Sequence, residues 1–356
     1  MRVVKDTDEE VVKRVFLPHH PVIKESSTTT KVRVVFDASC KTSTGVSLND
    51  ALFAGPIVQQ ELRSIILRSR FRQVMVVADV EKMFRQMWVT LLDTPLQCIL
   101  WFGPDNEIVT YELITVTYGT KSAPFLATRT LKQLADDERE RFPLAAQTVY
   151  EDVYMDDVIT GADDIESAIE LPHQIDAMLI SGGFRLRKWA SKAAEVLKDI
   201  PKEDLALPSA QGIDWDRDAE VKTLGLTWLP NTDCFKFQFT VPPVADNQHF
   251  TKRSVLSIVA RLFDPLGLLG AAITTAKIFM QRLWSLEDEQ NQKLNWDDRL
   301  PKTVGEEWRK YQQQLPLLND FKQAKQNNIG YNLKMSEGST PPSSEDQNSD
   351  KKLYAL

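Results

Sequence analysis

Two short segments, far apart in the sequence, constrain this chain more than any other feature. Residues 74–80, VMVVADV, form an apolar run with Asp79 next to its end, a pattern typical of a strand buried inside a sheet. Residues 154–157 are Tyr-Met-Asp-Asp, and apolar residues flank them on both sides. Two adjacent carboxylates in apolar surroundings repel each other, unless one takes up a proton or a cation lies beside them.

Each segment also has a simpler explanation. Asp156 and Asp157 suit a solvated hairpin turn, and Asp79 could cap a helical turn that follows it. A strand ending in Asp with a Tyr-x-Asp-Asp hairpin about 75 residues later is a rarer combination. It suits hard cations bound by carboxylate oxygens, and two such ions ~4 Å apart stabilise both oxygens of a phosphoryl displacement. We therefore expect Asp79 to face Asp156 and Asp157.

The overall composition indicates a folded chain without a membrane segment. The 356 residues are 42% apolar, which suffices for two or three subdomains with substantial cores. No stretch approaches ~18 uncharged apolar residues, and the charged start MRVVKDTDEE does not resemble a signal peptide. Cys40, Cys98 and Cys234 are odd in number and widely spaced, so we expect buried thiols in a reducing compartment rather than disulfides or a zinc site.

The negative charge of the chain is concentrated in one segment. Residues 131–170 contain 12 Asp and Glu against three Lys and Arg, whereas the whole chain has a net charge of −7. The rest of the chain is therefore slightly positive. The acidic segment is either a solvated face or a cation site, and the total charge does not exclude a nucleic-acid partner.

Hydrophobic periodicity predicts alternating strands and helices. The expected strands are 31–37, 74–80, the hairpin 97–102 and 108–114, two short strands within 148–162, and the hairpin 221–230 and 234–241. The expected helices are 57–72, 123–141, 164–183, 252–264, 268–289 and 300–315. From about residue 320 the chain is polar, and we expect a disordered tail because little apolar surface can be buried there.

Several further blocks accompany the carboxylates in a fixed order. They are VIKESSTTTKVRVVFDAS (22–39), Tyr118–Pro124, Gly183–Trp189, Leu224–Leu226 and Arg261–Gly267. Together with Asp79 and the Tyr-Met-Asp-Asp block, these segments resemble the reverse transcriptase of BEL/Pao-type LTR retrotransposons, from about Leu17 to about Trp284.

This resemblance implies an RNA-directed DNA polymerase and assigns roles to individual residues. The catalytic residues and metal ligands would be Asp79, Asp156 and Asp157, with Mg²⁺ or Mn²⁺ as cofactor. The nucleotide-binding residues would be Lys24, Arg33, Phe84, Tyr118 and Gly119. The primer or template contacts would be Tyr154, Met155, Lys192, Leu224 and Gly225. Phe84 would block a 2′-hydroxyl and so select deoxynucleotides.

Most of these positions also have an ordinary structural explanation. Lys24 and Arg33 could be surface cations, Phe84 could be plain core, and Gly225 could simply permit a hairpin. Lys188 and Lys192 could lie on a solvated face, contact phosphate, or donate a proton to pyrophosphate.

The resemblance also implies an architecture, namely an α+β right-hand polymerase fold with fingers, an antiparallel-sheet palm and a helical thumb or connection. The expected division is an N-terminal segment (1–16), fingers and palm with a primer-grip hairpin (17–245), a thumb or connection (246–318) and a disordered polar tail (319–356). The implied partners are an RNA template, a DNA primer and deoxynucleoside triphosphates, without a membrane. The implied location is a cytoplasmic virus-like particle, and the oligomeric state is left open.

The chain departs from the family pattern in several respects. Tyr118 stands where many retroviral enzymes carry Gln. We find no Asp-Thr/Ser-Gly protease motif, no convincing ribonuclease H carboxylate set after about residue 290, and no zinc pattern of an integrase. We therefore expect a polymerase without protease, ribonuclease H or integrase motifs. The alternative is a catalytically inactive, transposon-derived remnant that binds nucleic acid.

Overall fold

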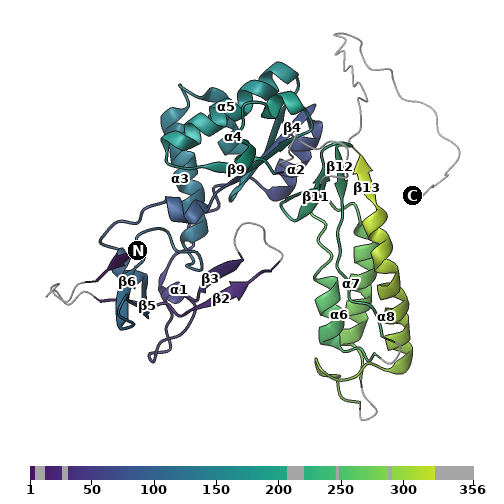
Figure 1. The fold of residues 1–356 in the computed structure, drawn as a ribbon. Coiled ribbons are helices and arrows are strands. Elements are labelled where there is room, and N and C mark those ends of the chain that lie inside the picture. The colour runs from purple at the N-terminus through teal and green to yellow at the C-terminus, as the bar shows by residue number, and fades with distance from the viewer. Residues whose placement is uncertain (5–12, 26–30, 207–219, 246–247, 288–290, 325–356) are drawn as a thin grey trace, which may run out of the picture. The chain divides into compact units, whose positions relative to one another are not determined.

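The computed structural model describes residues 1–4, 13–25, 31–206, 220–245, 248–287 and 291–324 (Figure 1). Within these ranges the strands form antiparallel sheets with the orders β1-β6-β5, β2-β3, β7-β8-β4-β9 and β10-β11-β12-β13. The strands are β1 (Arg2–Val3), β2 (His19–Ile23), β3 (Val32–Phe36), β4 (Val74–Val80), β5 (Cys98–Phe102), β6 (Ile108–Glu112), β7 (Val153–Tyr154), β8 (Asp157–Ala162), β9 (Leu186–Ser191), β10 (Val221–Thr223), β11 (Leu226–Leu229), β12 (Cys234–Lys236) and β13 (Lys322–Ala324). The helices are α1 (Leu48–Ala51), α2 (Leu62–Phe71), α3 (Ala123–Glu138), α4 (Pro143–Glu151), α5 (Ile165–Ser181), α6 (Lys252–Val259), α7 (Gly270–Trp284) and α8 (Lys302–Gln314), with a short 3-10 helix η1 (Met83–Gln86) after β4.

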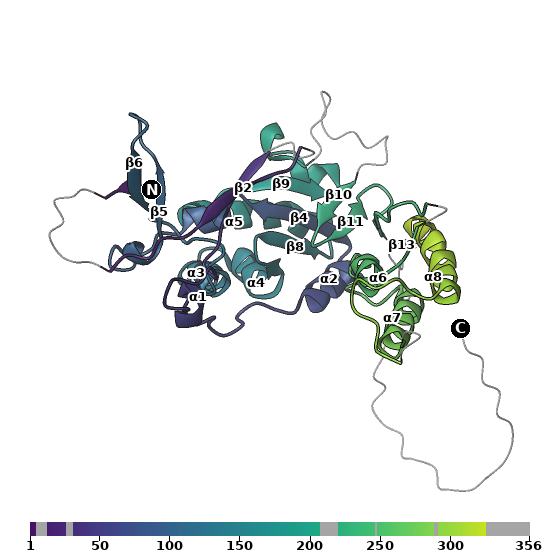
Figure 2. The ribbon, with the colours of Figure 1, turned by 90° about the horizontal axis from the view of Figure 1, so that it is seen from below.

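Strand β4 lies inside the sheet β7-β8-β4-β9 and is covered on both faces, as its continuous apolar sequence predicts. Its even-numbered residues belong to one core cluster, which helices α3, α4 and α5 complete on that face (Figures 1 and 2). Helix α3 contributes small and apolar residues at spacings of four, from Ala123 to Ala135. This spacing presents one apolar stripe of the helix to the sheet.

The odd-numbered residues of β4 face a second cluster. Met75 and Val77 pack there with Ile65 and Ile66 of α2 and with side chains of the β10-β11-β12-β13 sheet. Because side chains alternate along a strand, Asp79 lies on this second face. It is 24% exposed at the side chain, whereas Met75 and Val77 are buried. The regular alternation therefore places Asp79 at the edge of this second cluster.

Strand β9 contains a bulge beside Asp79. Val77 pairs with Ala190, but Asp79 pairs with Arg187, so β9 carries one extra residue between these two pairs. Lys188 within this interval has a φ of 55°, in the left-handed region. Such an extra residue bends the strand and changes the direction of the side chains around it.

Most of the expected elements are present, but several differ in extent. The helix expected over 57–72 begins at Leu62, the strand expected over 234–241 ends at Lys236, and the helix expected over 268–289 ends at Trp284. The segment 148–162 begins as the last turn of α4, and its strands are only β7 and β8. The expected strand 221–230 is two strands, because the chain reverses at Leu224 and Gly225. The helix expected over 252–264 ends at Val259.

The start of the polar tail also differs from the prediction. Residues 322–324 form β13 and pair with β12, and Asn319 hydrogen-bonds both backbone groups of Phe239. Backbone pairing and these side-chain bonds order residues 319–324 despite their low apolar content. The remainder of the predicted tail, 325–356, lies outside the described residues.

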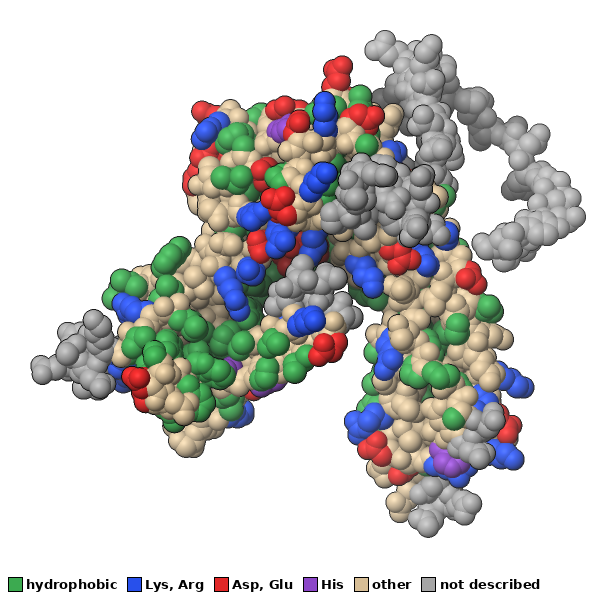
Figure 3. Space-filling model, viewed as in Figure 1, with side chains coloured by type: hydrophobic (Ala, Val, Ile, Leu, Met, Phe, Trp, Pro, Cys, Tyr) green, Lys and Arg blue, Asp and Glu red, His purple; other side chains and the backbone are tan. Residues whose placement is uncertain are grey.

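The β1-β6-β5 sheet carries an exposed apolar surface. Its members are Leu100, Trp101, Phe102 and Ile108, each about half exposed or more, and Figure 3 shows hydrophobic side chains gathered over this region. Trp101 also contacts the ring of His19 from β2.

The cysteines partly follow the prediction. Cys98 and Cys234 are buried thiols, whereas Cys40 is exposed, and none of the three forms a disulfide. No helix in the described ranges combines the length and the apolar character needed to cross a membrane.

Candidate active site

Asp79 and Asp157 are directly opposite each other on the paired strands β4 and β8. Directly opposite residues of an antiparallel pair project from the same face, so the two carboxylates are neighbours. Asp156 lies in the tight turn between β7 and β8, and its carbonyl oxygen accepts a hydrogen bond from the Val80 N–H at 2.7 Å. The hairpin is thus fastened to the end of β4, and the expected meeting of Asp79 with Asp156 and Asp157 is confirmed.

The turn itself has an unusual backbone. Met155 has a φ of 56°, a left-handed conformation that a non-glycine residue adopts at some cost. Its N–H donates to the side-chain oxygen of Gln59 at 3.1 Å, which holds the strained turn from outside the hairpin. Tyr154 pairs with Asp157 in the ladder and packs against the second core cluster.

The environment of Asp156 and Asp157 disfavours their charged forms. Burial raises the pKa of Asp157 to about 7, and the charges of Asp156 and Asp79 act in the same direction. Burial also raises the pKa of Asp156, and the charge of Asp79 adds to the effect. The positive charge of Lys188 lowers the pKa of both groups. Three acidic groups that repel one another and are partly desolvated favour a bound cation.

Lys188 provides positive charge at this site. Its ammonium lies 2.9 Å from Oδ2 of Asp79. The neighbouring Arg187 instead pairs with Glu81 at 2.9 Å and approaches Asp204 at 3.7 Å. The bulge in β9 therefore places two consecutive cations next to the end of β4.

The donor set fits a hard divalent cation in its chemistry. The three carboxylates offer only oxygen ligands, which Mg²⁺ and Mn²⁺ prefer. In the described part of the chain, no three His, Cys, Asp or Glu side chains are already arranged to hold a metal ion.

The turn between β10 and β11 reaches the same site. Burial raises the pKa of Asp157, and a hydrogen bond from the Leu224 backbone offsets a small part of this rise. Leu224 and Gly225 both have positive φ, 47° and 76°, so this turn depends on a backbone that glycine adopts easily. A Cβ on Gly225 would lie 2.8 Å from the Phe263 ring. The structure thus brings two of the expected primer-contacting residues beside the carboxylates.

The expected nucleotide-binding aromatics form a separate group. Phe84 lies in η1, and its ring centroid is 6.2 Å from that of Tyr118. Tyr118 is 5.3 Å from Phe36 of β3, and its hydroxyl accepts a hydrogen bond from Arg85 at 3.3 Å. Gly119 has a φ of 97°, and a Cβ there would lie 2.3 Å from the Phe36 carbonyl oxygen. Close backbone contact between this loop and β3 therefore requires glycine.

The two expected triphosphate contacts lie on or beside the β2-β3 ribbon. Arg33 of β3 is exposed, and its positive charge lowers the pKa of Asp156, so it acts on the carboxylate site. Lys24 follows β2, and its N–H donates to the Lys31 carbonyl at 2.8 Å. Their contacts with a nucleotide stay predictions.

Lys192 is not brought to the carboxylates. It follows the far end of β9, where Ser191 pairs with Val76, and its ammonium lies 3.4 Å from Asp233. Asp233 also accepts hydrogen bonds from Arg70 at 2.8 Å and from the Trp228 indole at 3.1 Å. This ion-pair cluster lies at the turn between β11 and β12. A primer contact of Lys192 stays a prediction.

Lys188 was not among the assigned site residues, although its sequence contains a signal. Leu186 and Trp189 are buried in the same cluster although they are three residues apart. In a regular strand such residues face opposite sides, so this spacing indicates a bulge with a displaced residue between them.

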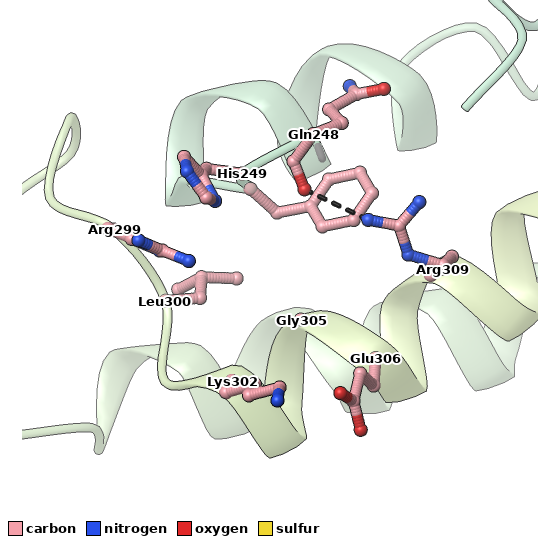
Figure 4. Close-up of a pocket in the computed structure, with 9 residues that line it drawn as sticks. Gln248, His249, Arg299, Leu300, Lys302, Gly305, Glu306 and Arg309 are labelled. Atoms are coloured by element: carbon pink, nitrogen blue, oxygen red, sulfur yellow. Dashed lines mark hydrogen bonds between the residues drawn. The ribbon is translucent and has the colours of Figure 1, made fainter. Parts of the chain in front are cut away.

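A pocket of about 220 Å³ lies apart from the carboxylates, around the first turn of α8 (Figure 4). Its lining includes the cationic side chains Arg299, Lys302 and Arg309. Arg309 is engaged with the carbonyl oxygens of Ala245 and Gln248 at 2.6 and 3.0 Å. The pocket is therefore shaped partly by hydrogen bonds within the chain.

Two solved structures of foamy viral proteins have a similar fold. The foamy viral protease-reverse transcriptase dRH in complex with ds DNA matches with a TM-score of 0.52 and 14% identity, over 87% of this chain and 45% of that chain. The foamy viral protease-reverse transcriptase in complex with RNA/DNA hybrid matches with a TM-score of 0.53 and 13% identity, over 88% and 35%. The fold is similar to that of a retroviral reverse transcriptase fragment. The chain spans less than half the length of these proteins.

A family model corrects one expectation from the sequence. The model of the Pao retrotransposon-like RNaseH-like domain matches residues 251–333. The expectation that the chain carries no ribonuclease H motif is therefore wrong. That expectation rested on the carboxylates after residue 290, whereas the matched segment starts at α6, and its described part is mainly helical. No curated protein matches the chain. The retrotransposon domain and the retroviral fold together support a retroelement-related protein.

Proposed function

We propose that the chain is an RNA-directed DNA polymerase of a BEL/Pao-like retrotransposon. Its substrates would be deoxynucleoside triphosphates, added to a DNA primer on an RNA or DNA template. The observation that carries the proposal is the direct pairing of Asp79 with Asp157, with Asp156 fastened to the same strand end. Similarity to enzymes solved with double-stranded DNA and with an RNA/DNA hybrid supports a duplex substrate.

Some residues of the site would supply or neutralise charge, and others would position the substrates. Asp79, Asp156 and Asp157 would hold the cations, and Arg33 would neutralise the triphosphate from the β2-β3 ribbon. Bound Mg²⁺ or Mn²⁺ would stabilise the attacking 3′-oxygen and the leaving pyrophosphate. The Leu224-Gly225 turn would position the primer end beside Asp157. Phe84 and Tyr118 would form an aromatic wall for the nucleotide.

The decisive experiment is primer extension with the Asp156→Asn variant. An amide has the shape of the carboxylate but lacks its charge, so we expect Mg²⁺-dependent extension to fall by ~10³-fold or more, as for loss of a main electrostatic stabiliser. Extension at a near wild-type rate would remove Asp156 from the mechanism.

A control separates chemistry from folding. Asp163→Asn changes an exposed carboxylate that pairs with Arg72 at 3.0 Å, away from the turn. It should extend primers normally. If the wild-type chain itself binds a primer-template duplex but never extends it, the chain is instead a nucleic-acid-binding remnant.

The family model favours a second candidate, ribonuclease H activity within residues 251–333. Cleavage of the RNA strand of an RNA/DNA hybrid would test it. Because Asp156 lies outside that segment, Asp156→Asn should leave such cleavage unchanged. Loss of both activities in the variant would show that one site is responsible for both.

A further inference from the structure

We propose that Lys188 is an intramolecular counter-ion that occupies the position of a divalent cation beside Asp79 and leaves when a cation binds. The proposal rests on the proposed function, because it takes Asp79 as a metal ligand. It adds a residue that controls when the site accepts metal.

The bulge places Lys188 where a regular strand would not. Leu186 and Trp189 both remain in the cluster under the sheet, and the extra residue absorbs the odd spacing between them. Lys188 adopts a left-handed φ of 55° at this position, which is unfavourable for a non-glycine residue. Its ammonium reaches Oδ2 of Asp79 at 2.9 Å. Backbone strain of this kind clusters at functional sites, so it supports a role for the cation.

Neighbouring cations have other anionic partners. Arg187 pairs with Glu81 at 2.9 Å, and Arg185 donates to both oxygens of Asp204 at 2.8 and 3.0 Å. Both guanidinium groups are thus paired with carboxylates other than Asp79. Lys188 is thus the cation of this group that contacts a proposed metal ligand.

The charge of Lys188 acts on the whole carboxylate group. It lowers the pKa of Asp156 and of Asp157, as a bound cation at the same place would. The side chain is 54% exposed, so it can swing into solvent without breaking apolar packing. A lysine suits such exchange, because its ammonium is a strongly hydrated point charge on a flexible stem.

The proposal predicts competition between the ammonium and a metal ion for Asp79. Mn²⁺ binding to the full chain, without nucleic acid or nucleotide, can be measured from the loss of the free Mn²⁺ signal in electron paramagnetic resonance. Lys188→Met keeps an unbranched side chain, and hence the backbone strain, but removes the charge. We expect the Kd for Mn²⁺ to fall roughly 1.5- to fivefold, the range for losing one competing ion pair of this exposure.

A matched control is Lys192→Met, which removes a lysine from the far end of the same strand, where it pairs with Asp233. Its Kd for Mn²⁺ should equal that of the wild type. A second readout is melting temperature: saturating Mn²⁺ should raise it more in Lys188→Met than in the wild type. Lys188→Gln serves if the Met variant does not fold.

Unchanged or weaker Mn²⁺ binding by the Lys188 variants would overturn the proposal and leave Lys188 as a permanent ion pair. Asp79→Asn distinguishes this failure from failure of the proposed function. If Asp79→Asn abolishes Mn²⁺ binding while Lys188→Met binds like the wild type, only the counter-ion role is wrong. If Asp79→Asn binds Mn²⁺ like the wild type, Asp79 is not a metal ligand and both proposals fail at this residue.

Discussion

Phe84 is a half-buried side chain whose role can be separated from its packing. It follows Asp79 by five residues, and its ring faces Tyr118. If the ring excludes a 2′-hydroxyl, Phe84→Val should raise kcat/KM for ribonucleotides relative to deoxynucleotides, because the clash is relieved in the reacting complex. Single-nucleotide incorporation kinetics on a primer-template measure this ratio.

Packing alone makes a different prediction for the same residue. Phe84 also packs against the central core cluster, so the substitution should cost ~1–4 kcal/mol of unfolding free energy. Phe142→Val provides the control, because Phe142 is also half-buried against that cluster. It should lose stability without a change in sugar preference. Unchanged sugar discrimination in Phe84→Val would refute the selective role.

Gly119 tests how closely the loop before α3 must approach β3. Its φ is 97°, and an added Cβ would lie 2.3 Å from a backbone oxygen that cannot rotate away. Gly119→Ala should therefore lower the unfolding free energy by about 2–4 kcal/mol, through strain and displacement of the loop. Denaturant unfolding measures the loss.

Gly45 is the matched control for Gly119. It has a φ of 79°, but a Cβ there meets nothing within 4 Å. Gly45→Ala should cost only the backbone strain, about 1 kcal/mol. Equal losses in the two variants would mean that the close approach to Phe36 contributes nothing.

Single residues also show what a sequence can indicate about the site. The adjacent carboxylates and the strand ending in Asp79 were sufficient to predict that the three acids meet, because strand alternation is regular. The Lys188–Asp79 pair was not predicted, because it depends on a bulge that shifts the register of β9 by one residue. The role of Lys192 was implied by the family resemblance, and the structure places this residue at the end of β9 that lies away from Asp79.

The hairpin β11-β12 is anchored to helix α2 by a buried ion pair. Arg70 is 8% exposed at its side chain and lies 2.8 Å from Asp233. Removing the Asp233 side chain would leave the buried Arg70 guanidinium without its carboxylate partner. Asp233→Ala should therefore lower the unfolding free energy by about 3–5 kcal/mol, as is found when one partner of a buried pair is removed.

Denaturant unfolding of Asp233→Ala can be compared with that of Asp163→Ala. Asp163 pairs with Arg72, the residue that follows α2, but the Asp163 side chain is 62% exposed. Exposed pairs contribute about 0–1 kcal/mol, so the control should change little. A loss for Asp233→Ala no larger than the control would show that the pair does not anchor the hairpin.

Elements were easiest to predict where one period dominates. Strand β4 and helices α3 and α5 have long, regular apolar patterns, and the expected segments contain them. The short strands β10 and β11 were read as one, because the Leu224-Gly225 reversal interrupts an otherwise apolar run. The pairing of β13 with β12 was missed because main-chain hydrogen bonds order a segment whose side chains carry little apolar signal.

The carboxylate site should impose a pH dependence on the stability of the chain. The pKa of Asp157 in the folded state is raised from its usual value to about 7. The folded state therefore binds the proton more tightly, and the stability from this group is fully present below about pH 4 and is lost as the pH rises to 7. In the absence of divalent cations, the unfolding free energy of Asp157→Asn should therefore exceed that of the wild type by about 1–3 kcal/mol between pH 5 and 8.

The control for this measurement is Asp297→Asn. Its hydrogen bond from Arg253 lowers the pKa of Asp297, so its contribution is lost only as the pH falls below the usual range of a carboxyl group. The difference in unfolding free energy between this variant and the wild type should be constant from pH 5 to 8. A constant difference for Asp157→Asn as well would contradict the burial of its charge.

For the chain as a whole, local patterns gave the mixed α/β character but not the relationship of its last third. Residues 246–318 were expected to be helical, and α6, α7 and α8 are found there. Helical periodicity alone does not distinguish a thumb from another domain, since both bury an apolar stripe. The match to an RNaseH-like domain therefore came from sequence similarity and not from any pattern that physical chemistry makes obvious.

The site beside Asp79 is assembled from distant parts of the chain, and this has a consequence for synthesis on the ribosome. Asp79 and Lys188 are 109 residues apart, so β4 leaves the ribosome long before the strand that supplies its counter-charge. Until β8 and β9 have been made, β4 is an apolar segment with open edges, which other chains can pair with. Slowing translation just after β9 should therefore reduce aggregation, whereas a pause before β8 should increase it.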